Sequence, residues 1–283
     1  MPPTGTQLCL AAQQRLEAAG IQDGYRDATL LFWHVLNGQP GVTVGRHHLS
    51  RHLMAPVPDG VAQAFEAAIS AREARQPVSQ ITGWRDFWNH RFRVTRDTLD
   101  PRPDTETLVE CALSAPFRRV LDLGTGTGAI LISVLAERPG ATGVGTDISD
   151  AALQVARGNA ERIGVRADFI RSDWFSDVAG RFDLILSNPP YIALDEMAGL
   201  SPEVRDWEPR GALTDEGDGL SAYRAIAAGA GAHLAPEGRI IVEIGLTQAD
   251  AVCAIFQAAG FAQTRVHRDL DGRNRVIVAQ RKQ

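Results

Sequence analysis

The chain has 283 residues, of which 44% are hydrophobic and 22% are charged, a balance typical of globular proteins and unlike that of disordered, collagen-like or coiled-coil chains. Its 29 Lys and Arg against 34 Asp and Glu give a formal net charge of -5, so general attraction to a nucleic-acid backbone is not favoured. Lys282 is the only lysine, which excludes enzymes that need a Schiff-base or phosphate-loop lysine inside the fold.

The cysteines and the start of the chain indicate the compartment. Cys9, Cys111 and Cys253 are far apart and form no C-x-x-C or metal-ligand spacing, so we expect free thiols in a reducing cytosol and no metal site. Gln13, Gln14, Arg15 and Glu17 interrupt the apolar residues near the N-terminus. No run approaches the ~20 apolar residues that a membrane helix needs. We therefore predict a cytoplasmic protein that is not associated with a membrane.

Residues 1–80 are predicted to form a small helical domain. Apolar residues recur at intervals of three and four over residues 8–16 and 30–36, as in amphipathic helices. A third such helix is predicted over Val61–Arg75, with Asp59 as its N-cap. This pattern indicates a small helical bundle, which we expect to dock a substrate.

Residues 81–103 are predicted to be a linker. Aromatic residues among Arg, Asp and Asn between Trp84 and Leu99 favour a short β-hairpin over a helix. Two prolines then stiffen the connector, and Asp104 or Thr105 can cap the helix that follows.

Residues 104–283 alternate short apolar runs with helical patterns. This order predicts an α/β fold, a doubly wound and mostly parallel sheet with helices on both faces. The tail adds two strands, over 261–266 and 275–279, joined by a turn-like segment, so the sheet is expected to end in an antiparallel pair. The predicted parallel strands are Val120–Leu123, Thr142–Thr146, Asp168–Ile170, Phe182–Leu186 and Arg239–Ile244.

A glycine-rich loop follows the first of these strands: Gly124, Thr125, Gly126, Thr127 and Gly128. Alternate glycines permit a tight turn close to a ligand, and the next helix presents free backbone N–H groups at its start. The loop therefore predicts a nucleoside-containing cofactor. Its G-x-G-x-x-A spacing fits a nicotinamide cofactor and S-adenosylmethionine equally well.

Acidic and aromatic side chains at neighbouring strand ends add to this site. Asp147 ends the second strand, where a carboxylate can accept both ribose hydroxyls, although it can also cap the next helix unless a residue such as Ser149 does so. Trp174 can cover one face of an adenine, with Asp173 accepting from its amino group, or it can pack in the core. Asp122 can support the glycine loop or meet a ligand ammonium group.

The segment Asn188-Pro189-Pro190-Tyr191 directly follows the strand Phe182–Leu186 and so lies at the carboxyl edge of the sheet. Two prolines stiffen the turn, so the Asn188 amide oxygen and the Pro189 carbonyl can act as rigid acceptors for a planar NH2 group. Fixed acceptors orient the nitrogen and favour localisation of its lone pair in the transition state. Tyr191 can supply an aromatic wall for the planar group.

These motifs occur together with others along the chain. The full set is Gln80 to Gly83, Phe87-Trp88, Pro101 to Glu106, Asp122 to Gly128, Asp147, Trp174, Asn188 to Tyr191, Glu208-Pro209 and Asp218 to Leu220. With this set the chain resembles class I S-adenosylmethionine-dependent methyltransferases, and more specifically the release factor glutamine methyltransferase (PrmC, or HemK) family. One departure is Asp100, where the family usually has an apolar residue; we expect it to affect only local packing.

The resemblance implies N5-methylation of the glutamine in the Gly-Gly-Gln loop of class I peptide chain release factors, with S-adenosylhomocysteine as the product. It also implies that the proline-rich segment Pro101 to Glu106 shapes the substrate groove. We expect a monomer that binds no nucleic acid directly. The residues predicted to bind the cofactor are Gly124, Thr125, Gly126, Thr127, Gly128, Asp147, Trp174 and Asn188; those predicted to bind substrate are Asn188, Pro189, Pro190 and Tyr191, with Asn188, Pro189 and Tyr191 also catalytic.

Three other functions compete with this hypothesis. A nucleic-acid methyltransferase acting on adenine N6 would use the same acceptors but needs a basic surface. The chain through Arg93 has nine Arg against seven acidic residues, and the remainder has 20 basic against 27 acidic, which argues against one. A nicotinamide dehydrogenase would need a hydride-transfer acid or base that we do not find. A non-enzymatic binding module would not need Asn188.

Overall fold

The computed structural model describes residues 1–281 and divides the chain into two compact units. The first, here called the helical unit, comprises residues 1–83 and 202–207. The second, here called the sheet unit, comprises residues 84–201 and the chain from Glu208 onward. Lys282 lies outside the described residues. In the described part of the chain, no helix has the length and apolar character needed to cross a membrane.

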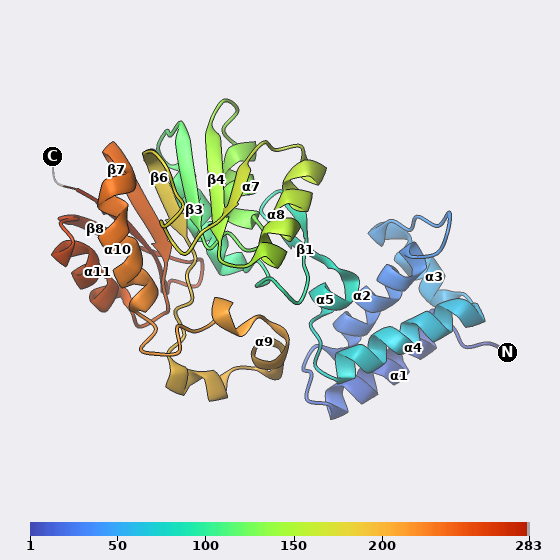
Figure 1. Cartoon of the computed structure of the whole chain (residues 1–283). Helices are drawn as coiled ribbons and strands as arrows, with labels where there is room; N and C mark the ends of the chain where they lie inside the picture. The colour runs from blue at the N-terminus through green and yellow to red at the C-terminus, as the bar shows by residue number, and fades with distance from the viewer. Residues whose placement is uncertain (282–283) are drawn as a thin grey trace. The chain divides into compact units, whose positions relative to one another are not determined.

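The helical unit forms around the predicted amphipathic helices (Figure 1). Leu16, Leu31 and Ile69 are fully buried, and Phe32 meets Phe65 edge-to-face with ring centroids 5.6 Å apart. The predicted Asp59 cap is not formed, because the third long helix begins at Asp59 itself and has no side-chain capping bond. The elements are α1 (Gly5–Ala18), α2 (Gly24–Asn37), η1 (Arg46–His48), α3 (Leu49–Met54), α4 (Asp59–Glu73) and α5 (Val78–Thr82).

A short helix from much later in the chain, α9 (Pro202–Trp207), belongs to the helical unit. Its Glu203 pairs with Arg72 at 2.9 Å and with Arg75 at 2.7 Å. At its other end the Trp207 indole donates to the Ala74 carbonyl at 3.1 Å. The chain that leaves the sheet unit after residue 201 is therefore anchored on α4 before it returns.

The sheet unit has the predicted α/β architecture. Its seven-stranded sheet has the order β5-β4-β3-β6-β7-β9-β8. Neighbours from β5 to β7 are parallel, and β9 is antiparallel to both of its neighbours, which confirms the doubly wound sheet with an antiparallel end. The strands are β3 (Arg119–Leu123), β4 (Thr142–Asp147), β5 (Asp168–Arg171), β6 (Phe182–Ser187), β7 (Leu234–Glu243), β8 (Gln263–Arg268) and β9 (Asn274–Gln280).

Two hydrophobic clusters cover the two faces of this sheet because successive strand residues point to opposite sides. Val120 belongs to the cluster with α6, α7 and α8, whereas Leu121 belongs to the cluster with α10 and α11 (Figure 1). The helices and 3-10 turns are η2 (Pro103–Thr105), α6 (Glu106–Leu113), α7 (Ala129–Ala136), α8 (Asp150–Ile163), η3 (Leu194–Gly199), η4 (Arg210–Ala212), α10 (Ser221–His233) and α11 (Ala249–Ala258).

The predicted hairpin forms from β1 (Trp84–Phe87) and β2 (His90–Arg93). Phe87 and Phe92 are buried in the same cluster as α6 and α7, so the hairpin is part of the sheet unit's core. The sequence predicts this hairpin as part of a linker, because contacts with distant helices leave no pattern in the hairpin's own residues.

The ion pairs of Glu203 lead to a prediction about stability. Arg72 is nearly buried and is neutralised by Glu203 and by Asp27, whose Oδ2 lies 2.7 Å from Nε. We expect Glu203→Gln to lower the free energy of unfolding by about 1–3 kcal/mol, because a buried guanidinium loses one of its two charged partners. Urea denaturation of the full chain measures this.

The control is Asp206→Asn in the same helix. Among residues 1–281, Asp206 has one ion-pair partner, its exposed neighbour Arg205, so the denaturation midpoint should not move. Equal shifts for the two variants would contradict a stabilising role for the buried pair.

Candidate active site

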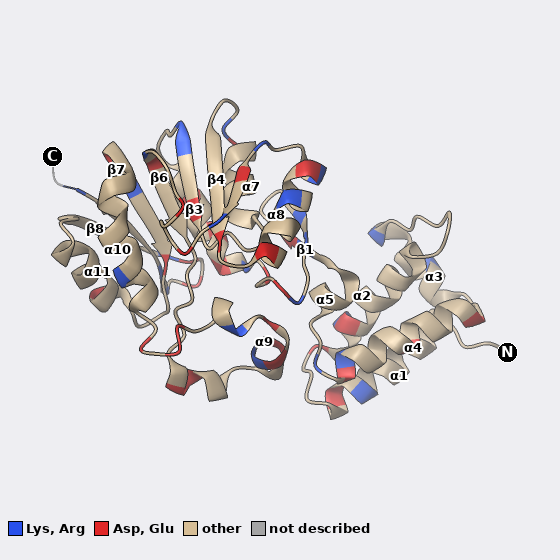
Figure 2. Ribbon diagram, in the orientation of Figure 1, with Lys and Arg blue, Asp and Glu red and all other residues tan. Residues whose placement is uncertain are grey.

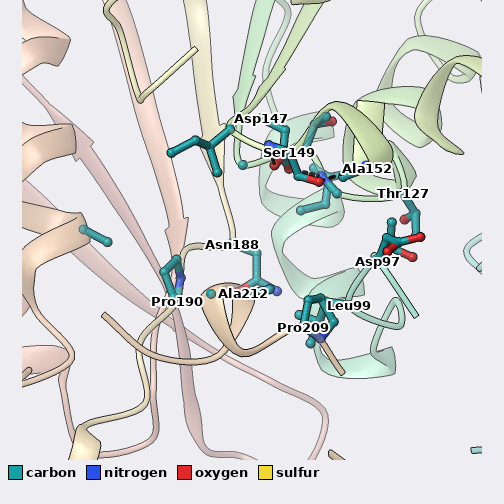
Figure 3. A pocket seen from close by; sticks show the side chains of 18 of the residues that line it. Asp97, Leu99, Thr127, Asp147, Ser149, Ala152, Asn188, Pro190, Pro209 and Ala212 are labelled. Atoms are coloured by element: carbon teal, nitrogen blue, oxygen red, sulfur yellow. Dashed lines mark hydrogen bonds between the residues drawn. The ribbon is translucent and has the colours of Figure 1, made fainter. Parts of the chain in front are cut away.

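A cavity of about 670 Å³ lies at the carboxyl edge of the sheet, within the range of small-molecule sites. Its wall comes from the loops after β3, β4, β5 and β6, from the chain before η2, and from residues 209–225. In Figure 3, Asp147 and Ser149 lie at one side of this cavity, with Asn188 and Pro190 at another. The structure thus brings together side chains that the sequence placed at separate strand ends.

The glycine-rich loop has the backbone that its sequence predicts. Gly126 has φ of +54° and Gly128 has φ of +78°, a region that other residues rarely adopt. A Cβ on Gly128 would lie 2.8 Å from Ile132 Cδ1, whereas one on Gly126 would meet nothing within 4 Å. Gly128 therefore permits close packing of α7, while Gly126 leaves open space beside backbone that lines the cavity.

Asp122 supports this loop from beneath. Its Oδ2 accepts from the Thr125 hydroxyl at 2.6 Å, and the Thr125 N–H donates to the Thr146 carbonyl at 2.8 Å. Burial raises the pKa of Asp122 to about 7, although the Thr125 hydrogen bond opposes that change. Because Asp122 is completely buried and the lining residues do not include it, its interactions favour the supporting role over contact with a ligand.

Asp147 links the loop to the start of α8. Its Oδ2 accepts from the Gly126 N–H and its Oδ1 from the Ser149 N–H, both at 2.9 Å. The Ser149 hydroxyl accepts from the Ala152 N–H and thereby caps α8, so Asp147 is not needed as the cap. The carboxylate is half-buried and lines the cavity. Its remaining lone pairs suit the two hydroxyls of a ribose.

Trp174 and Asp173 also line the cavity. Trp174 has a positive φ of 49°, and its carbonyl accepts from the Ser172 hydroxyl at 2.9 Å, which holds the turn after β5. The indole packs partly against the core cluster that contains α10. Packing and lining therefore coexist in Trp174, whereas the sequence analysis weighed them as alternatives.

Asn188 leaves β6 and lies in the cavity wall together with Gly124, Asp147 and Trp174. Its Nδ2 donates to the Thr105 hydroxyl at 3.3 Å. Its Oδ1 is buried and has no hydrogen-bond partner within residues 1–281. A buried acceptor without a partner costs about 1–3 kcal/mol, which a donor from a bound molecule would recover.

The other residues of this segment are placed differently. Pro190 lines the cavity, but the described lining residues do not include Pro189 or Tyr191. The Tyr191 hydroxyl instead donates to Glu243 Oε1 at 3.4 Å, and its ring packs against a core cluster. Burial raises the pKa of this phenol. The placement of Tyr191 therefore does not support the aromatic wall that the sequence predicts.

An ion pair that the sequence does not predict lies beside the cavity. Arg102 Nη2 lies 2.6 Å from both carboxylate oxygens of Glu208, and Arg102 and Pro209 line the wall. Burial raises the pKa of Glu208 to about 7, with Arg102 opposing and Asp100 adding to the rise. Asp100 is itself buried and lines the cavity, so the expectation that it affects only local packing is wrong. The motifs around Pro101 and Glu208 were the available signal, but nothing in them indicated that they pair.

Among residues 1–281 no group of three or more His, Cys, Asp or Glu side chains is arranged to hold a metal ion.

Comparisons with known proteins agree with this site. Residues 7–83 match the family model "PrmC N-terminal domain", and residues 89–199 match "Methyltransferase small domain". Over 271 residues the chain is 57% identical to the release factor glutamine methyltransferase of Cereibacter sphaeroides, covering 95% of each chain. The chain belongs to the release factor glutamine methyltransferase family. The Rhodospirillum rubrum relative is 45% identical over 95% of this chain and 82% of its own.

Solved structures support the fold of the family. The structure of a methyltransferase from Pyrococcus furiosus matches with a TM-score of 0.54 at 17% identity, covering 77% of this chain and 98% of that one. At this identity the similarity concerns the fold alone.

S-adenosylmethionine is the cofactor of this methyltransferase family, as the sequence resemblance implied. The cavity fits it: open space over Gly126 and lone pairs on Asp147 suit a nucleoside, and Trp174 supplies an apolar surface. Those residues would hold the cofactor, which supplies an electrophilic methyl group when bound. The individual roles of these residues remain predictions.

Asp147→Asn tests the nucleoside contact. An amide has one oxygen, so it cannot accept from the Gly126 and Ser149 N–H groups and from a ribose as the carboxylate can. We expect the affinity for S-adenosylhomocysteine to fall about 10- to 100-fold, measured by calorimetry. An unchanged affinity would exclude Asp147 from the cofactor site.

Gly126→Ala tests the glycine loop and has a matched control in Gly140→Ala. Both glycines have positive φ and open space at the Cβ position, but Gly140 lies outside the described cavity lining. We expect both variants to lose about 1–2 kcal/mol of stability through backbone strain. Only Gly126→Ala should also weaken cofactor binding; equal affinities would contradict close approach of a ligand to this loop.

Proposed function

We propose that this protein methylates the N5 atom of the glutamine side chain in the Gly-Gly-Gln loop of class I peptide chain release factors. The observation that carries the proposal is the buried Asn188 Oδ1, an acceptor without a partner in the described chain, in the wall of a cavity that fits S-adenosylmethionine. Relatives named as release factor glutamine methyltransferases match nearly the whole chain and support the same substrate.

The chemistry explains why an acceptor matters more than a base. An amide nitrogen is a weak nucleophile because its lone pair is delocalised, and its N–H groups need acceptors when they leave water. Asn188 Oδ1 would bind one N–H. The second acceptor expected from the sequence is the Pro189 carbonyl, although Pro189 is not among the described residues that line the cavity. Two fixed acceptors hold the nitrogen toward the methyl donor and stabilise the positive charge that develops on it.

The helical unit is proposed to dock the release factor. Its match to the family's N-terminal domain over residues 7–83 supports this role. A cytoplasmic location and a monomeric state remain predictions from the sequence.

Asn188→Ala tests the proposal directly. The variant loses the amide acceptor but none of the interactions of Asp147 or the glycine loop, so turnover should fall at least about 100-fold while affinity for S-adenosylhomocysteine stays near normal. Mass spectrometry of a release factor incubated with enzyme and S-adenosylmethionine measures one added methyl group on the glutamine. Asn89→Ala, an exposed asparagine on the hairpin, is the matched control.

An unmodified release factor with the intact enzyme would overturn the proposal. The nucleic-acid alternative predicts instead a steep loss of substrate binding as salt is added. Figure 2 shows both charge signs on α4 and on α8, and mixed charges of this kind do not form the basic surface that phosphates require. We therefore expect a shallow dependence on salt.

A further inference from the structure

The side chain of Asn188 can face the substrate with either end of its amide. Rotation about its last torsion exchanges an acceptor oxygen for a donor NH2 group, and only the oxygen can accept from a substrate amide. The direction of the amide therefore has to be imposed by its neighbours. Within the described chain, the hydrogen-bond partner of the Asn188 side chain is the Thr105 hydroxyl, which accepts from Nδ2 at 3.3 Å.

Thr105 is unusual for a residue at the start of a helix. It occupies the N-cap position of α6 and is only 3% exposed, yet its side chain makes no capping hydrogen bond. The hydroxyl instead accepts from Asn188, and it lies near enough to Glu243 to lower the pKa of that carboxyl, whose buried Oε2 is an acceptor without a partner within residues 1–281. A hydroxyl has one proton, so while that proton points to Glu243 only lone pairs face Asn188, and these bind Nδ2 and repel Oδ1.

Glu243 ends β7, the neighbour of β6 in the sheet, and is 1% exposed. Tyr191 donates to its Oε1, and Tyr223 donates to its backbone carbonyl at 2.9 Å. The positive charge of Arg275 lowers the pKa of Glu243, whereas the negative charge of Asp104 raises it. Arg275 lies 3.0 Å from Asp104 and 3.3 Å from Asp269, so one guanidinium serves several carboxylates.

We propose that Glu243 and Thr105 are positioning residues that fix the Asn188 amide with its oxygen available to the substrate NH2 group. The inference rests on the proposed function, because it assigns the polarity of the acceptor on which amide methylation depends. The sequence indicates Thr105 only as a helix cap and as part of the segment Pro101 to Glu106, and it assigns no role to Glu243; neither residue is expected to touch the methyl group. Each acts through its neighbour: Glu243 orients the Thr105 hydroxyl, and that hydroxyl orients Asn188.

The chain of hydrogen bonds depends on the ionisation of Glu243. Burial raises the pKa of Glu243 to about 7, against the lowering effects of Thr105, Arg275 and Tyr191. Below that pH the protonated carboxyl can donate to the Thr105 oxygen, and the Thr105 proton is then free to bind Asn188 Oδ1. The amide would turn its donor end outward, so methyl transfer falls as the pH drops through this range.

The first test separates the hydroxyl from the shape of Thr105. Thr105→Val keeps the volume but removes the hydroxyl, and kcat for release factor methylation should fall about 10- to 100-fold with little change in KM for S-adenosylmethionine. Thr105→Ser restores the hydroxyl and should restore most of kcat. Thr107→Val, at a buried threonine of α6 outside the described cavity lining, controls for packing and should retain wild-type kcat.

The second test is the pH profile of kcat for the wild type, Glu243→Gln and Thr105→Val. The wild type should lose activity on the acid side of about pH 7. Both variants should have lower kcat values that change less with pH, because in neither of them can protonation of Glu243 turn the Thr105 hydroxyl and so the Asn188 amide. Asp122 and Glu208 also have pKa values raised to about 7. If both variants still lost activity below about pH 7, the loss would come from Asp122 or Glu208, and the role of Glu243 would be overturned.

The outcomes distinguish this inference from the proposed function. An active wild type whose Thr105→Val variant keeps full kcat overturns the inference alone. A wild type that binds S-adenosylhomocysteine but methylates no release factor overturns the proposed function, and the inference with it. Loss of activity in Thr105→Val without recovery in Thr105→Ser would indicate a packing role and would also overturn the inference.

Discussion

The parallel pairing of β3 with β4 and β6 is the constraint from which the site follows. These strands are adjacent and run in the same direction, so the residues that follow each of them meet at one edge of the sheet. The chain leaves the hydrogen-bonded ladder there, and its polar groups bind one another instead: the Gly126 N–H to Asp147, and Asn188 to Thr105. The proposed nucleoside site and the proposed amide-binding site thereby share one cavity.

Buried carboxyl groups around this cavity hold its loops in place. Asp122 binds Thr125 under the glycine loop, Glu208 binds Arg102 in the wall, and Glu243 accepts from Tyr191 in the segment that contains Asn188. Burial raises the pKa of each carboxyl to about 7. A site that must orient a weak nucleophile gains from such groups, because preorganised hydrogen bonds need not be reorganised when the reaction takes place.

The segment after Asn188 connects the two units along the chain. Pro190 lines the cavity, α9 pairs with Arg72 and Arg75 of the helical unit, and Pro209 then lines the cavity again. The wall of the cavity is thus covalently continuous with the unit that is proposed to dock the substrate.

The sequence by itself determined the strands, the glycine loop, the place of Asp147 and the place of Asn188, because apolar periodicity and turn chemistry are local properties of the chain. Tertiary structure decided the contacts between distant residues, as between Arg102 and Glu208, 106 positions apart, and between Thr105 and Asn188, 83 apart. Local rules assigned Thr105 to a helix cap and Tyr191 to the cavity wall. Their partners Asn188 and Glu243 come from other strands, and only the packing of those strands brings the polar atoms within hydrogen-bond distance.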